Sequence, residues 1–137
     1  MKYEVRYLSK TGNTKKNADE IAKLLKIEAL TIETPVSNDT DILFLGGAPY
    51  GFQIDANLKE YINNITNKNI KVALFSTSAF FKMAEKNMRK LLIKNDIEVL
   101  PDSFYTKGEY GKANIGKPDK DDLIKVKEFV DKIKEYK

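Results

Sequence analysis

Short apolar runs alternate with longer segments of helical periodicity along the whole 137-residue chain. Runs of β-branched and aromatic residues predict strands at residues 3–8, 27–32, 42–46, 71–76 and 97–105. The third and fourth runs hold only apolar residues over 42–45 and 72–75, a pattern typical of strands buried on both faces.

Apolar residues recur at three- and four-residue spacing in four longer segments, which predicts helices over residues 14–26, 55–65, 80–95 and 119–136. The last segment shows this stripe most clearly, at Leu123, Val126, Val130 and Ile133. Pro118 and Asp119 before it are typical of a helix start. The alternation of strands and helices predicts a parallel sheet covered by helices.

The chain length suits a single compact domain, residues 1–137. Only about eight residues, 33–40, remain between the second and third predicted strands. A parallel crossover normally needs more, so we expect a turn or one helical turn there.

The chain contains neither cysteine nor histidine. This composition excludes disulfides, typical zinc sites, thiol nucleophiles and histidine-based catalytic arrangements. Redox chemistry would therefore need a cofactor.

The 24 Lys and Arg against 20 Asp and Glu give a net charge of +4, spread without a dense basic block, so we expect no nucleic-acid partner. Residues 1–8 alternate charged and apolar positions, unlike a signal peptide, and no later stretch could span a membrane. A cytoplasmic protein is expected.

The most informative motif lies between the first strand and the first helix, and reads Ser9, Lys10, Thr11, Gly12, Asn13 and Thr14. A helix N-terminus presents unpaired N–H groups and a positive dipole end. Hydroxyls and a glycine let the chain wrap an anion closely. The motif predicts a phosphate site, and the alternative is that the hydroxyls only cap the helix.

This motif resembles the Ser/Thr-x-Thr-Gly-Asn-Thr signature of the flavodoxin family, whose members bind the phosphate of flavin mononucleotide (FMN) at this loop. Other nucleotide motifs, Gly-x-Gly-x-x-Gly and Gly-x-x-x-x-Gly-Lys, are absent from the sequence. The resemblance implies a short-chain, flavodoxin-like α/β fold: a doubly wound parallel sheet of five strands, order 2-1-3-4-5, in three α/β/α layers.

Ligands of such sheets bind at the carboxyl ends of the strands, where loops converge. The candidate loops after the third and fourth strands combine small residues with aromatics: Ala48, Pro49, Tyr50 and Gly51, then Thr77, Ser78, Ala79 and Phe80. By the resemblance, Tyr50 and Phe80 would cover the two faces of the flavin ring. Alternatively these aromatics pack beneath neighbouring loops, which we expect for Phe52 and Phe81.

Gly51 has a second possible role by the same resemblance. In flavodoxins a peptide beside the flavin N5 rotates on reduction, and a glycine eases that rotation. A plain turn glycine is the alternative.

The resemblance implies an electron carrier that passes electrons between FMN and a larger redox partner, with no catalytic side chain and no metal. The alternatives are an FMN enzyme of the same fold, of the quinone reductase or protoporphyrinogen oxidase type, and a flavin-free module that binds phosphoanions. Flavodoxins are typically acidic, whereas this chain is basic and carries Lys82, Lys107 and Lys112 near the predicted site. A partner with an acidic docking face is therefore expected.

Overall fold

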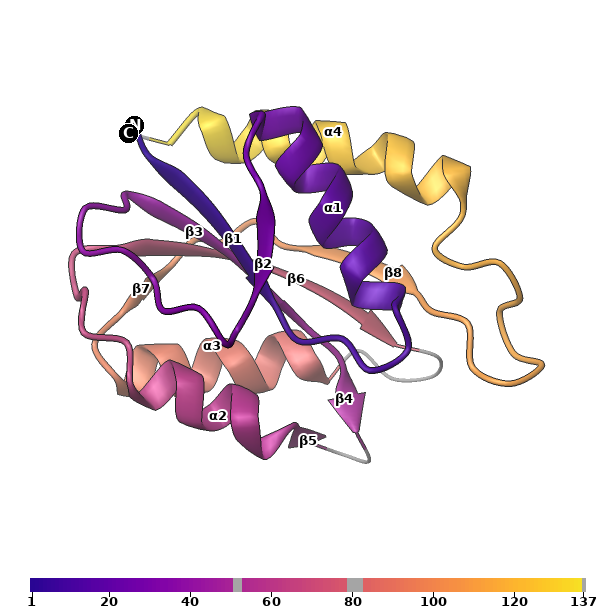
Figure 1. The fold of residues 1–137 in the computed structure, drawn as a ribbon, viewed down its shortest axis with the longest axis horizontal. Coiled ribbons are helices and arrows are strands. Elements are labelled where there is room, and N and C mark those ends of the chain that lie inside the picture. Colours follow the sequence, from indigo (N-terminus) through magenta and orange to yellow (C-terminus); the bar gives the residue numbers. More distant parts are fainter. Residues whose placement is uncertain (51–52, 79–82, 137) are drawn as a thin grey trace.

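The computed structural model describes residues 1–50, 53–78 and 83–136 (Figure 1). The main strands are β1 (Tyr3–Tyr7), β2 (Ala29–Thr31), β3 (Ile42–Gly47), β6 (Lys71–Ser78), β7 (Glu98–Val99) and β8 (Phe104–Lys107). A small hairpin joins β4 (Pro49–Tyr50) to β5 (Gln53–Ile54). The helices are α1 (Asn13–Leu25), α2 (Ala56–Asn63), α3 (Ala84–Lys94) and α4 (Lys120–Lys134).

The main sheet is parallel, in the order β2-β1-β3-β6, with β7 and β8 both on the outer side of β6. The predicted order 2-1-3-4-5 is confirmed, because β6 is the fourth predicted strand and the fifth is present as two pieces. Pro101 lies between those pieces and has no N–H to donate to a neighbouring strand.

Helices cover both faces of the sheet, α1 and α4 on one and α2 and α3 on the other (Figure 1). Alternate residues of the central strands enter the two cores, so that Phe44 packs towards α4 and Leu43 towards α2 and α3. The three-layer α/β/α arrangement is therefore as predicted.

Element ends differ from the sequence prediction by a few residues. The second strand is only three residues long, and Lys26 ends α1 with a left-handed φ of 58°. Asp119 does start α4, through a reciprocal capping box with Asp122. The expected start of the third helix, residues 80–82, lies outside the described residues. The β4–β5 hairpin was not predicted.

The connection between β2 and β3 consists of turns and extended chain, as its short length predicted. Two charged residues of β1 hold this connection in place through hydrogen bonds. Arg6 is only 3% exposed and donates hydrogen bonds to the carbonyls of Thr34 (2.9 Å) and Pro35 (3.1 Å). Its guanidinium also pairs with Glu4 at 2.8 Å.

Glu4 anchors the other end of the same connection. Its carboxylate accepts hydrogen bonds from the Ser37 N–H (2.9 Å) and the Thr40 hydroxyl. Burial works against the charge, yet these donors and Arg6 together hold the pKa of Glu4 below its usual value. An ion pair between the buried Arg6 and the half-buried Glu4 thus holds this short connection where a parallel crossover would normally have a helix.

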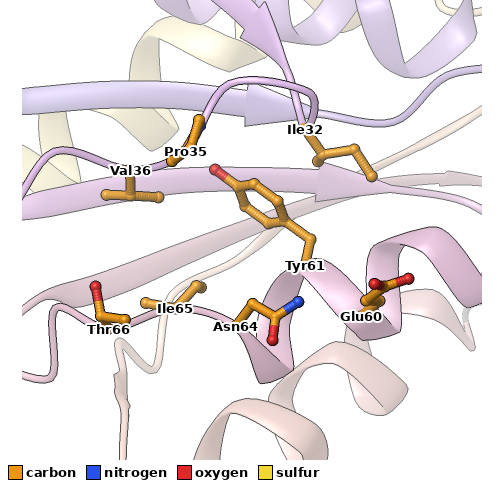
Figure 2. A pocket seen from close by; sticks show the side chains of 8 residues that line it. All are labelled: Ile32, Pro35, Val36, Glu60, Tyr61, Asn64, Ile65 and Thr66. Atoms are coloured by element: carbon orange, nitrogen blue, oxygen red, sulfur yellow. The ribbon is translucent and has the colours of Figure 1, made fainter.

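A groove of about 320 Å³ lies between this connection and α2 (Figure 2). Its apolar walls come from Ile32, Pro35, Val36 and Ile65. The Tyr61 side chain crosses it and donates a hydrogen bond to the Thr34 carbonyl at 2.8 Å. Burial raises the pKa of Tyr61 to about 12, so this hydroxyl keeps its proton and its donor role.

Candidate functional site

The predicted phosphate loop, residues 9–14, joins the end of β1 to the start of α1. Gly12 is the N-cap residue, with a φ of 90° that L side chains rarely adopt, and it places no side chain against the first helical N–H groups. Ser9 Oγ instead accepts a hydrogen bond from the Gly12 N–H at 3.0 Å. The alternative of simple hydroxyl capping therefore does not describe this helix, whose N-terminus has no side-chain cap.

Two buried contacts fix the first turns of α1 against the sheet. The hydroxyls of Thr14 and Thr77 share a hydrogen bond of 2.8 Å. One turn further on, Asn17 Nδ2 donates to the Thr106 hydroxyl at 2.9 Å. Asn17 Oδ1 is buried without a hydrogen-bond partner among the described residues. These hydrogen bonds thus hold the start of α1 against β6 and β8. The sequence alone did not indicate that Asn17 and Thr106 take part in the site.

A third contact links the loop to the chain that follows β8. Asn13 Nδ2 donates to the Glu109 carbonyl at 2.8 Å. Gly108 lies so close that a Cβ there would be 2.7 Å from Asn13 Nδ2, so a larger residue would displace the amide. Residues 108–117 then turn back on themselves through paired hydrogen bonds between Tyr110 and Ala113.

The predicted ring loops start at the same edge of the sheet (Figure 1). Ala48 and Pro49 are half-buried just after β3, and Thr77 and Ser78 are buried at the end of β6. Tyr50 forms the end of β4. Gly51, Phe52, Ala79, Phe80, Phe81 and Lys82 lie outside the described residues. The described part of both loops therefore lies beside the phosphate loop, and the roles of Tyr50, Gly51 and Phe80 stay predictions.

The glycine pair at the end of β3 serves packing. A Cβ on Gly46 would lie 2.1 Å from the Phe75 ring, and one on Gly47 would lie 2.6 Å from Leu58 Cδ2. Neither glycine is explained by a ligand, because the core already fills the space beside it.

Charged side chains lie on both sides of the loop. Lys10 pairs with Asp55, the N-cap residue of α2, at 2.9 Å. That ammonium and the Asn57 N–H lower the pKa of the Asp55 carboxyl. Lys107, the last residue of β8, and Lys112, on the segment after it, are both exposed. Lys117, at the end of that segment, is paired with Asp119 and Asp122.

These features make the loop better suited to bind a phosphate monoester than a plain turn would be. The α1 N-terminus has no side-chain cap, the loop is built of small polar residues, and three separate contacts hold it in place. The sheet topology and this loop together define the class: a flavodoxin-like α/β protein.

Residues 4–115 match the family model described as "Flavodoxin domain". The chain belongs to the flavodoxin family, among its short-chain members.

Solved structures agree with this fold. A flavodoxin from the domain Archaea superposes with a TM-score of 0.81 at 17% identity, covering 97% of this chain and 96% of that chain. Oxidised Flavodoxin 1 from Bacillus cereus gives a TM-score of 0.74 at 19% identity, with 100% of both chains covered. A Fusobacterium nucleatum flavodoxin bound to flavin mononucleotide gives 0.70 at 14% identity, with 99% of both chains covered.

Comparison with curated protein sequences gave no match. Among the described residues, no helix is long and apolar enough to cross a membrane.

Proposed function

We propose that this protein binds FMN noncovalently at the carboxyl edge of its sheet and carries electrons to or from a larger redox partner protein. The observation that supports this most is the phosphate loop, with its uncapped α1 N-terminus held by Thr14, Asn13 and Asn17. Family membership and the FMN-bound Fusobacterium relative support the same cofactor.

FMN, when bound, supplies the electron transfer, and the chain supplies binding and surroundings. The N–H groups at the start of α1 would hold the phosphate. Thr14 and Thr77 would keep these groups in place, because their shared hydrogen bond is buried. The loops that begin at Ala48 and Ser78 would flank the ring.

Titration of the purified protein with FMN and with riboflavin, followed by flavin fluorescence, tests the cofactor. We expect one FMN per chain and weaker binding of riboflavin, which lacks the phosphate. A protein that takes up no FMN, and releases none on heating, would contradict the proposal.

A matched pair of variants localises the phosphate. Gly12→Ala and Gly116→Ala both place a Cβ at a positive φ, 90° and 81°, with no other atom within 4 Å. Their costs in folding free energy should therefore be similar. Only Gly12→Ala should weaken FMN binding. Equal FMN affinities for the two variants would mean that the phosphate binds elsewhere.

The surface beside the site supports a partner with an acidic docking face. Tyr110 and Ile115 are 65% and 74% exposed on the segment after β8, which also carries Lys112, and Lys107 is the last residue of the strand before it. Glu109 lies among them and accepts a hydrogen bond from the Gly116 N–H at 2.6 Å. Exposed apolar groups with two exposed lysines in the same stretch of chain suit a partner patch that combines apolar groups with carboxylates.

The sign of the charge on this surface can be tested with ferricyanide, an anionic electron acceptor. The FMN-loaded protein is photoreduced, and its oxidation by ferricyanide is followed by stopped flow. The rate constant should fall as salt is added, and should fall at low salt in a Lys107→Gln/Lys112→Gln variant. Lys125→Gln, an exposed site on α4, is the control. A rate that rises with salt would contradict an acidic partner.

A further inference from the structure

The Lys10–Asp55 ion pair joins two segments that are far apart in the sequence. Lys10 belongs to the phosphate loop, and Asp55 directly follows the β4–β5 hairpin. Lys10 Nζ lies 2.9 Å from Asp55 Oδ2, and the two side chains are 53% and 13% exposed. The lysine thus reaches from one candidate flavin loop to the base of the other.

Asp55 is firmly held at its end of the pair. Its Oδ1 accepts a hydrogen bond from the Asn57 N–H at 2.7 Å and so caps α2. The preceding residue, Ile54, is 4% exposed in the core and pairs with Pro49 across the hairpin. The carboxylate is therefore held by α2 and adjoins the hairpin, so its contact with Lys10 links the phosphate loop to the hairpin.

We propose that the Lys10–Asp55 ion pair is a positioning contact that fixes the hairpin carrying Tyr50 relative to the phosphate loop, so that binding of the flavin ring depends on it. The inference rests on the proposed function, because the inference assumes that the flavin ring of FMN binds beside this hairpin. Its physical basis is preorganisation: a ligand that spans two loops binds more tightly when the loops are already held at the right separation.

Riboflavin separates this effect from direct attraction between Lys10 and the phosphate. Riboflavin has no phosphate, so removing the charge of Lys10 cannot weaken its binding through lost attraction to the phosphate. Asp55→Asn removes the charge and keeps a good N-cap residue. Lys10→Gln removes the other charge at an exposed position.

We expect each single variant to raise the riboflavin Kd about three- to fivefold, near the upper end for a partly exposed ion pair. The Lys10→Gln/Asp55→Asn double variant should bind riboflavin no more weakly than either single variant, because the contact is already lost. The control is Lys15→Gln, which breaks the exposed Lys15–Asp19 pair (2.6 Å) on α1 and should leave the riboflavin Kd unchanged.

Unchanged riboflavin affinity in both single variants would overturn the inference, and so would additive losses in the double variant. Urea unfolding of each variant checks that the fold is retained; Lys10→Gln alone decides the question if Asp55→Asn does not fold. A wild-type protein that takes up no FMN would instead contradict the proposed function, so the two failures are distinguishable.

Discussion

Replacing Arg6 with methionine should lower the free energy of unfolding more than any substitution at an exposed position would. Methionine is unbranched, flexible and uncharged, so although it is shorter it can fill most of the space beneath the β2–β3 connection. It cannot donate the hydrogen bonds that Arg6 gives to Thr34, Pro35 and Glu4. The change therefore tests whether these bonds replace a crossover helix.

The expected loss follows from the burial of the pair. Breaking a buried ion pair from one side costs about 3–5 kcal/mol, mostly because the remaining charge is left unpaired. Glu4 is 15% exposed and keeps its donors Ser37 and Thr40, so the lower end applies, about 3 kcal/mol. Arg6→Lys keeps the positive charge but lacks the planar guanidinium with its several N–H donors. It should therefore lose less stability than Arg6→Met.

Urea unfolding at pH 7 measures this loss. With a slope of about 2 kcal/mol/M, a 3 kcal/mol loss moves the midpoint by roughly 1.5 M. The Glu4→Gln/Arg6→Met double variant should regain about 1 kcal/mol of this, because no charge is left unpaired. Limited proteolysis should cut Arg6→Met within residues 33–40 before the wild type is cut there.

A free energy of unfolding within 1 kcal/mol of the wild type for Arg6→Met would refute the reasoning. The connection would then be held by Tyr61 and by apolar contacts of Val36 with the core, not by the ion pair. Equal protease resistance of residues 33–40 in the variant and the wild type would lead to the same conclusion.

Three other predictions concern the core, acid stability and the site. Gly46→Ala places a methyl group against the Phe75 ring and should cost about 1–3 kcal/mol in urea unfolding; wild-type stability would contradict the packing role. The fold lowers the pKa of Glu4, and of Asp119 to about 2, relative to unfolded values of about 4 to 4.5, so their contribution to stability is fully present above about pH 5 and is lost as the pH falls through 4 towards the folded pKa values. Urea midpoints measured between pH 7 and pH 3 should stay flat down to about pH 5 and fall below it. Thr14→Val keeps the side-chain volume but removes the buried hydroxyl, and should weaken FMN at least tenfold in the fluorescence titration; unchanged affinity would show that this hydroxyl does not support the phosphate site.

The elements that local sequence determines were predicted well. Apolar runs over β3 and β6, the periodic stripe of α4 and the loop at residues 9–14 all depend on neighbouring residues alone. Strand order is a long-range property, and the family resemblance supplied it. The β4–β5 hairpin has two residues in each strand, too few to show a period of two.

Long-range polar contacts were not visible in the sequence. Glu4 and Arg6 alternate with apolar residues, which suggests one solvent-facing side of a strand, yet Arg6 is buried. The only indication was the short β2–β3 connection, which leaves that side of β1 without a helix. Asp55 was expected at a helix start, but its partner Lys10 lies 45 positions earlier, where no spacing rule applies.

Both edges of the sheet offer little for another chain to pair with. One edge is β2, with three residues, and the other is divided between β7, with two, and β8, with four. Long exposed edge strands are templates for aggregation, and short or interrupted ones avoid it. The break at Pro101 that divides the fifth strand therefore also protects the folded chain from edge-to-edge association at high concentration.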